Sequence, residues 1–104
     1  MDKITFDFND KTAVITGGAQ GFGLDIAKRF LKSGAKVIIW DIDPKMLDKA
    51  IKDLNDPNLS SNIVDVSNYK EVEKCTNEII KNFNVDILIN NAGITGPTAA
   101  LWEY

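Results

Sequence analysis

The stretch A-V-I-T-G-G-A-Q-G-F-G, residues 13–23, decides the fold of this chain. An apolar run that ends in a glycine-rich turn predicts a buried strand followed directly by a helix. Gly17 permits the tight turn out of the strand, and Gly21 lets backbone N–H groups approach an anion. Gly23 lets the helix pack close to the sheet, and the helix N-terminus offers unpaired N–H donors with partial positive charge. The turn is therefore a candidate site for the pyrophosphate of a dinucleotide, although an ordinary glycine-rich connection has the same pattern.

Short apolar segments alternate with amphipathic helical segments along the rest of the chain. Asp43 is a suitable N-cap for a helix that begins at Pro44, and the polar segment 53–62 is expected to be a loop. This alternation predicts an α/β fold of the Rossmann type, with three layers and a parallel sheet. The expected strands are residues 12–16, 36–41, 62–66 and 86–90, and the expected helices are residues 21–33, 44–54 and 67–83.

Composition excludes several classes of function. The formal net charge is −3, which disfavours a nucleic-acid partner because phosphate binding needs a basic surface. The chain has no histidine, so it contains no Ser-His-Asp triad and no histidine-based zinc site. Its one cysteine, Cys75, precludes an internal disulfide and is expected to be a buried, inert thiol. With no signal peptide and no apolar run long enough to span a bilayer, we expect a cytoplasmic protein without a membrane partner.

Asp41 ends the second expected strand, and ligands bind at the carboxyl ends of strands in an open parallel sheet. A carboxylate there accepts hydrogen bonds from both ribose hydroxyls of an adenosine. It also repels a 2′-phosphate, and the glycine turn has Gln20 where a Lys or Arg would offset that repulsion. The pattern therefore predicts NAD rather than NADP as the cofactor. The alternative is a solvated carboxylate at a strand end.

The loops after the third and fourth expected strands carry further candidate contacts. Asp65 is suited to accept a hydrogen bond from the adenine amino group while Val66 packs on the ring, although a helix-capping acid is an equal alternative. Asn90-Asn91-Ala92-Gly93 combines two amides with two small residues, which allows close backbone approach. A generic Asn/Gly turn is the alternative for this second loop.

Together these motifs resemble the short-chain dehydrogenase/reductase family over residues 11–97. Thr16, Gly17, Gly21 and Gly23 match T-G-x-x-x-G-x-G, Asp65-Val66 matches the D-V pair, and residues 90–93 match N-N-A-G. The resemblance implies a nicotinamide cofactor and strand order 3-2-1-4. It assigns Asn91 to the nicotinamide-side ribose and Asn90 to bracing the central strands, while Phe22 replaces a more usual aliphatic residue. The candidate cofactor-binding residues are Gly17, Gln20, Gly21, Phe22, Gly23, Asp41, Asp65, Val66, Asn91, Ala92 and Gly93, and no metal ligand is expected.

The family's catalytic Ser, Tyr and Lys have no counterpart among these residues. Tyr104 has no Lys four positions later, and the serines at 60, 61 and 67 precede the N-N-A-G segment. We therefore assign no catalytic residue and expect residues 1–104 to be a partial NAD-binding domain without its catalytic and substrate-binding part. A small-molecule substrate is expected only for a full-length form. The resemblance also leaves Ile87-Leu88-Ile89 on an open edge of the truncated sheet, which predicts self-association or aggregation.

The resemblance implies the cofactor-binding portion of an NAD-dependent oxidoreductase that moves hydride between nicotinamide and a carbonyl or alcohol. One alternative is a non-catalytic NAD-binding or interaction module, or the remnant of a truncated gene. A less favoured alternative is a fragment of an adenosylmethionine-dependent methyltransferase, which also uses a glycine turn and an acid after the second strand. The N-N-A-G segment argues against the methyltransferase.

Overall fold

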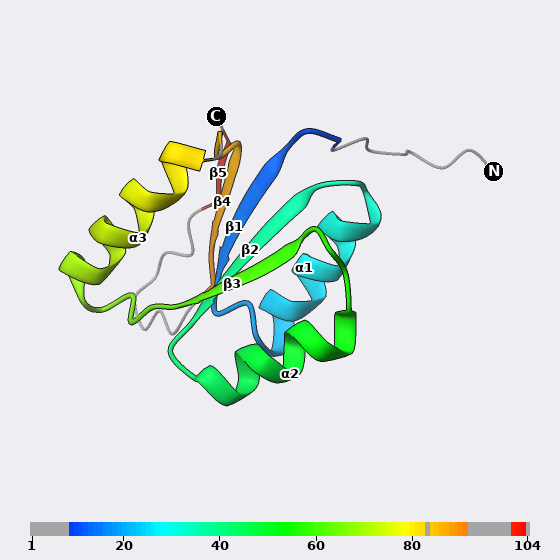
Figure 1. The fold of residues 1–104 in the computed structure, drawn as a ribbon, viewed down its shortest axis with the longest axis horizontal. Coiled ribbons are helices and arrows are strands. Elements are labelled where there is room, and N and C mark those ends of the chain that lie inside the picture. Colours follow the sequence, from blue (N-terminus) through cyan, green and yellow to red (C-terminus); the bar gives the residue numbers. More distant parts are fainter. Residues whose placement is uncertain (1–8, 83, 92–100, 104) are drawn as a thin grey trace.

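The computed structural model of the chain describes residues 9–82, 84–91 and 101–103. Strands and helices alternate from the first strand to the fourth, as the sequence predicts (Figure 1). The elements are β1 (Thr12–Thr16), α1 (Gly21–Lys32), β2 (Lys36–Asp41), α2 (Pro44–Leu54), β3 (Leu59–Ile63), α3 (Tyr69–Asn82), β4 (Ile87–Asn90) and β5 (Leu101–Glu103).

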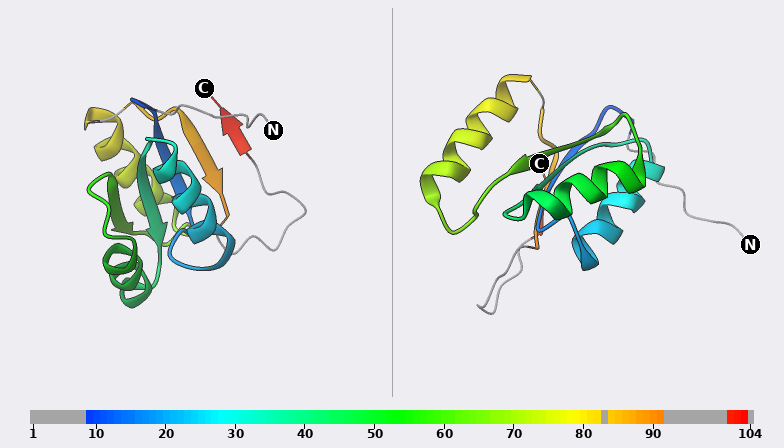
Figure 2. Two further views of the ribbon diagram at one scale, coloured as in Figure 1. Left: turned by 90° about the vertical axis from the view of Figure 1, so that its right-hand side faces the viewer. Right: turned by 60° about the horizontal axis from the view of Figure 1, so that its bottom comes forward.

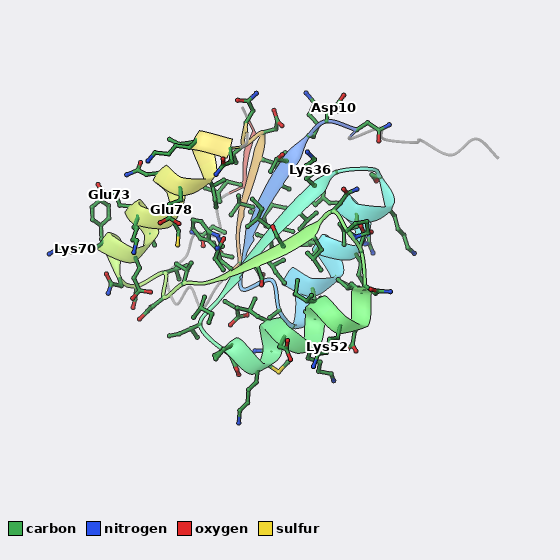
Figure 3. The ribbon with its side chains drawn as sticks, in the orientation of Figure 1. Asp10, Lys36, Lys52, Lys70, Glu73 and Glu78 are labelled. Carbon is green, nitrogen blue, oxygen red and sulfur yellow. The ribbon has the colours of Figure 1, made fainter. Side chains whose placement is uncertain are left out.

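The strands form one twisted sheet in the order β3-β2-β1-β4-β5. The first four strands are parallel, which confirms the expected order 3-2-1-4. Helices α1 and α2 cover one face of the sheet and α3 lies on the other, so the molecule has three layers (Figure 2). Charged side chains such as Lys52 and Lys70 extend from the helices into solvent (Figure 3). None of the described helices is both long enough and apolar enough to cross a membrane.

Strand β2 is buried on both faces because its apolar run supplies side chains to two cores. Val37 and Ile39 pack on the side of α1 and α2, together with Ile15 of β1. Ile38 and Trp40 pack on the side of α3. Burial of each large aliphatic side chain stabilises the fold by about 1.5–3 kcal/mol. The continuous apolar run therefore marks the central layer, as expected for a strand covered by helices.

Strand β3 begins earlier than the expected range 62–66 and lies partly within the segment expected to be a loop. It pairs with β2 from Val37 opposite Leu59 to Asp41 opposite Ile63. Leu59 is buried, whereas most of the strand is polar or exposed. An edge strand is held by backbone hydrogen bonds and needs only one apolar anchor, so its side-chain pattern is weak. Val64, which follows the strand, is buried in the core on the α3 side.

The edge of β4 is occupied by β5, and the expectation of an open edge there is wrong. Residues 101–103 run antiparallel to β4, with Ile89 opposite Leu101 and Ile87 opposite Glu103. An unpaired strand edge presents N–H and C=O groups that a nearby segment can satisfy. In this structure the chain's own later residues satisfy them, so the structure provides no open β4 edge for a second molecule.

The lone cysteine lies on the apolar side of α3. Cys75 packs against the core that contains Trp40 and Ile79, and it is partly buried. Burial raises the pKa of the Cys75 thiol, and Glu78 acts in the same direction. A thiol with a raised pKa is protonated and weakly reactive near neutral pH, which agrees with the expected inert role.

Candidate functional site

The glycine turn between β1 and α1 adopts a backbone conformation that glycine favours. Gly17 has φ +62° and Gly21 has φ +60°. A Cβ atom built on Gly21 would meet no atom within 4 Å, so open space lies in front of this residue. The combination fits the expected role of Gly21, since a backbone with free space in front of it is accessible to an anion.

Gly23 has a more local role than its expected one of packing the helix on the sheet. A Cβ atom there would collide with the carbonyl oxygen of Gly17 and would lie 2.8 Å from Nδ2 of Asn91. The glycine therefore lets the first turn of α1 approach the glycine turn itself and the end of β4. Any larger residue would push these three segments apart.

The N-terminus of α1 has no side-chain cap. Gln20 occupies the N-cap position in extended conformation and its side chain makes no capping hydrogen bond. The first turn of α1 also contains no acidic residue. The first N–H groups of a helix have no intrahelical acceptor, and they carry the positive end of the helix dipole. This end of α1 is therefore suited to an external anion.

Asp41 is fixed beside the glycine turn. Its side chain is nearly buried, with the residue 9% exposed. Oδ2 accepts a hydrogen bond from the N–H of Ala19 at 3.3 Å, and Oδ1 accepts one from the N–H of Asp43 at 3.2 Å. The alternative of a solvated carboxylate does not describe this geometry. Each carboxylate oxygen has a second lone pair, so the group retains capacity for a ligand hydroxyl.

A cleft of about 280 Å³ opens where β2 and β3 end. Two large aliphatic side chains are exposed there, Ile42 at 61% and Val66 at 37%. Exposed aliphatic side chains in a cleft suit the flat face of an aromatic base. Ile42 is not among the residues predicted from the sequence. The sequence signal that could have identified it is its position as an apolar residue directly after Asp41 in a polar loop. The lining residues are Trp40, Asp41, Ile42, Val64, Asp65, Val66 and Ser67.

Asp65 closes a turn before α3 and does not cap that helix. Its Oδ1 accepts hydrogen bonds from the hydroxyl of Ser67 at 2.6 Å and from the N–H of Ser67 at 2.9 Å. The hydroxyl bond, followed by the N–H bond, lowers the pKa of Asp65. Asn68 caps α3 instead, because its Oδ1 accepts from the N–H groups of Lys70 and Glu71. Asp65 is thus an ionised carboxylate on the wall of the cleft.

The end of β4 is tied to the glycine turn through Thr16. The Thr16 hydroxyl donates to Oδ1 of Asn90 at 3.0 Å and accepts from the N–H of Asn91 at 2.8 Å. Nδ2 of Asn91 donates to the carbonyl oxygen of Gly17 at 3.3 Å. The Asn90 bond joins β4 to β1, in line with the bracing role that the resemblance implies. Predicted residues Ala92 and Gly93 lie outside the described residues.

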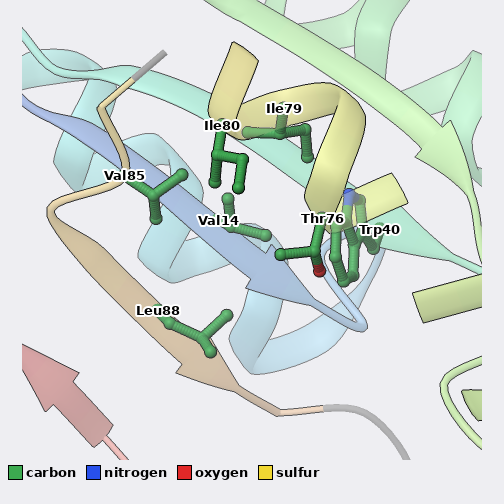
Figure 4. A pocket seen from close by; sticks show the side chains of 7 residues that line it. All are labelled: Val14, Trp40, Thr76, Ile79, Ile80, Val85 and Leu88. Atoms are coloured by element: carbon green, nitrogen blue, oxygen red, sulfur yellow. The ribbon is translucent and has the colours of Figure 1, made fainter. Parts of the chain in front are cut away.

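A second cavity, of about 290 Å³, lies between α3 and the neighbouring face of the sheet (Figure 4). The sequence does not single it out, because its lining comes from four separate elements and the segment before β4. All of its lining side chains except that of Thr76 are apolar. The lining residues are Val14, Trp40, Thr76, Ile79, Ile80, Val85 and Leu88. Trp40 also lines the cleft at the ends of β2 and β3.

Comparison with known proteins gives consistent matches. A family model for short chain dehydrogenases matches residues 11–102. A 3-oxoacyl-acyl-carrier-protein reductase from Rickettsia typhi is 42% identical over 95 residues, which cover 91% of this chain and 38% of that protein.

Two solved structures show the same fold with different cofactors. The 3-ketoacyl-(acyl-carrier-protein) reductase from Brucella melitensis, complexed with NADH, has a TM-score of 0.77 and 37% identity over 85% of this chain and 36% of its own. RhlG of Pseudomonas aeruginosa, complexed with NADP, has a TM-score of 0.78 and 27% identity over 86% of this chain and 37% of its own. The chain thus spans a little over a third of the length of these relatives.

Proposed function

Because the chain belongs to the short chain dehydrogenase family, we propose that it supplies the NAD-binding part of an oxidoreductase. The reaction is hydride transfer between the nicotinamide of NAD and a carbonyl or alcohol group. The observation that carries the proposal is the hydrogen bond between the Asp41 carboxylate and the N–H of Ala19. This bond holds a ribose-binding acid against a phosphate-binding turn, at the edge of the sheet where strands end.

The pyrophosphate is assigned to the glycine turn and the N-terminus of α1. The open space in front of Gly21 and the absence of a side-chain cap at Gln20 support this assignment. Gly17 and Gly23 hold the turn in shape, because larger residues there would be strained or would collide. Phe22 is 80% exposed on the first turn of α1, where a bound cofactor would cover it.

The adenosine is assigned to Asp41 and the neighbouring cleft. The carboxylate binds the ribose hydroxyls, and it disfavours NADP because two like charges in contact cost several kcal/mol. The base lies in the cleft near Ile42 and Val66, and Asp65 accepts from its amino group. The family alone does not decide the cofactor, since one similar structure is an NADP complex. The preference for NAD therefore rests on Asp41.

The nicotinamide side is assigned to Asn91, Ala92 and Gly93 on the strength of the family motif. The bond from Asn91 to the carbonyl oxygen of Gly17 supports a place beside the turn. We propose that turnover needs a Ser, Tyr and Lys outside residues 1–104, because Tyr69 has no lysine four positions later and the chain spans a little over a third of the length of its relatives. Residues 1–104 then form a partial domain, the full-length form binds the small-molecule substrate, and the protein acts in the cytoplasm.

Calorimetric titration with NAD and NADP tests the proposal, with Asp41→Asn as the variant. Asparagine removes the charge and keeps one oxygen, which can accept from the N–H of Ala19 or of Asp43 but not from both. We expect the preference for NAD over NADP to fall by about tenfold, which corresponds to about 1.4 kcal/mol. Asp48→Asn is the matched control, because Asp48 pairs with Lys52 on the outer side of α2.

The outcomes separate the parts of the proposal. An unchanged NAD/NADP ratio in Asp41→Asn would contradict the role of Asp41. A folded wild-type chain that binds neither dinucleotide would contradict the proposed function. Tighter binding of S-adenosylmethionine than of NAD would favour the methyltransferase alternative instead.

A further inference from the structure

The cleft assigned to adenine and the apolar cavity beneath α3 are separate spaces that meet at one side chain. The cleft measures about 280 Å³ and the cavity about 290 Å³. Among the described residues, Trp40 alone lines both. Figure 4 shows its side chain among those that line the cavity. Its neighbours in the cleft are loop residues such as Ile42 and Val66, whereas its neighbours in the cavity are core residues such as Val14 and Ile79.

The Trp40 indole is held in place from several sides. The residue is 4% exposed and belongs to the same core cluster as Val64 and Ile79. Its Nε1 donates a hydrogen bond to Oδ1 of Asn62 at 3.2 Å, and the two residues are paired across β2 and β3. A buried ring with its polar atom satisfied has a single preferred orientation. The indole is therefore held in place where it contributes to the lining of both spaces.

From this arrangement we propose that Trp40 is a specificity-determining residue for the base of the dinucleotide. The indole closes the inner end of the cleft and limits it to an unsubstituted adenine. The inference rests on the proposed function, because it takes the cleft as the adenine subsite. Trp40 would exclude larger bases by size. Apart from Thr76, the other residues that line the cavity behind Trp40 are apolar, so they offer a base little hydrogen bonding.

A smaller residue at position 40 would join the cleft to the cavity. In Trp40→Leu the space behind the base becomes continuous with the apolar side chains of Val14, Leu88 and Ile79. An adenine carrying a few extra atoms would then enter a space lined by hydrocarbon. Trp40→Phe retains one aromatic ring and loses the bond to Asn62, so it opens the inner end of the cleft less.

The test measures binding of NAD and of two analogues with enlarged adenines to the full chain by calorimetry. One analogue carries a methyl group on carbon 2 of the six-membered ring, which leaves the amino group assigned to Asp65 intact. The other carries bromine on the five-membered ring, so opposite edges of the base are probed. We expect the wild type to disfavour at least one analogue by about tenfold, as a packed pocket does for a few extra atoms. Trp40→Leu should remove most of that discrimination, and Trp40→Phe should remove a smaller part.

Ile79→Ala is the matched control. Ile79 lines the cavity but not the cleft, so its truncation enlarges the cavity and loosens the same core while the Trp40 indole is retained. Ile79→Ala should therefore keep the wild-type discrimination. Circular dichroism establishes that each variant is folded, and Trp40→Phe carries the test if Trp40→Leu does not fold.

The outcomes distinguish this inference from the function on which it rests. If the wild type binds NAD and both analogues equally well, or if the folded Trp40 variants keep full discrimination, the inference is overturned and the proposed function stands. The same holds if Ile79→Ala loses discrimination as much as Trp40→Leu does. If the wild type binds no NAD, the proposed function fails and the inference fails with it.

Discussion

Helices α1 and α2 both follow a parallel strand, yet their N-termini are built in opposite ways. At α2, Oδ1 of Asp43 accepts hydrogen bonds from the N–H groups of Lys45 at 2.9 Å and Met46 at 3.3 Å. At α1, Gln20 makes no side-chain capping bond and the next residue is Gly21. α2 thus closes its own N-terminus, whereas α1 leaves its N–H groups available.

The difference in capping supports the proposed anion site at the N-terminus of α1. An N-cap such as Asp43 stabilises a protein by about 1 kcal/mol, so the chain forgoes that stability at α1. α3 follows α2 in having a side-chain cap, from Asn68. Of the three described helices, only the one at the glycine turn lacks a cap, and a helix N-terminus without one is a ready anion site.

The largest expected effect comes from closing the open space at α1. Gly21→Val places a branched side chain at φ +60° in the region assigned to the pyrophosphate. We expect NAD affinity to fall by about 100-fold, which corresponds to about 2.7 kcal/mol. Calorimetry measures the affinity, and circular dichroism establishes that the helices remain.

Gly34→Val is the control for this prediction. Gly34 also has positive φ, at +93°, but it lies after the C-terminus of α1. Its replacement should lower stability without a comparable loss of affinity in the folded protein. Retained NAD affinity in folded Gly21→Val would show that the space in front of Gly21 is not used.

A smaller effect follows from giving α1 the cap that α2 has. Gln20 has extended backbone, as an N-cap requires, so Gln20→Asp should stabilise the protein by about 1 kcal/mol. The new carboxylate occupies N–H donors and repels phosphate, so NAD affinity should fall by about tenfold, or about 1.4 kcal/mol. Urea unfolding and calorimetry on one sample measure both changes.

Gln20→Ser separates the two causes of that loss. Serine supplies a cap without a charge, so its effect on affinity should lie between those of glutamine and aspartate. Unchanged affinity in both variants would remove the N-terminus of α1 from the proposed site.

Removing the cap of α2 is expected to affect stability alone. Asp43→Ala deletes the acceptor for Lys45 and Met46, and the free energy of unfolding should fall by about 1 kcal/mol. The N–H of residue 43 still donates to Asp41, because that bond is from the backbone. Calorimetry on folded protein should therefore give the wild-type affinity for NAD. A tenfold loss would mean that the two helix ends are less different in function than in structure.

The smallest expected effect concerns Asp65, whose side chain accepts hydrogen bonds from Ser67 two residues later, as an N-cap does, but in a turn and not at a helix end. The Ser67 hydroxyl, and then the Ser67 N–H, hold the pKa of Asp65 below its ordinary value of 3.8. A pKa that is lowered in the folded state stabilises the protein at pH values above the unfolded pKa. This stabilisation is lost as the pH falls through the folded-state pKa. Ser67→Ala should raise the pKa toward 3.8, as an NMR titration of the carboxyl carbon would show. An unchanged titration would contradict the role of the hydroxyl.

The sequence predicts strand bounds best where burial on both faces requires a continuous apolar run. The bounds of β1 and β2 agree with the expected ranges because both strands are apolar and buried on two faces. β3 is displaced from its expected range because an edge strand needs little apolar sequence. β5 was not expected, since three residues contain too little pattern to predict a partner strand.

The site shows the same limit. Gly21 and Asp41 follow from spacing alone, but the bond from Ala19 to Asp41 depends on how two loops meet in space. Trp40 is predictable as a strand residue, but that it lines both the cleft and the cavity is visible only in the structure. The sequence therefore indicates which chemical groups are present, whereas the contacts between segments that are distant in the sequence require the structure.

The hydroxyl of Thr16 has a consequence for the order in which the molecule assembles. Its partners Asn90 and Asn91 lie 74 and 75 residues further along the chain. Closing so long a loop is slow compared with forming the neighbouring helix. On the ribosome, the glycine turn is synthesised early but gains these bonds only after β4 has emerged. Within the part of the chain that the structure describes, the proposed cofactor site is thus completed only once β4 is in place.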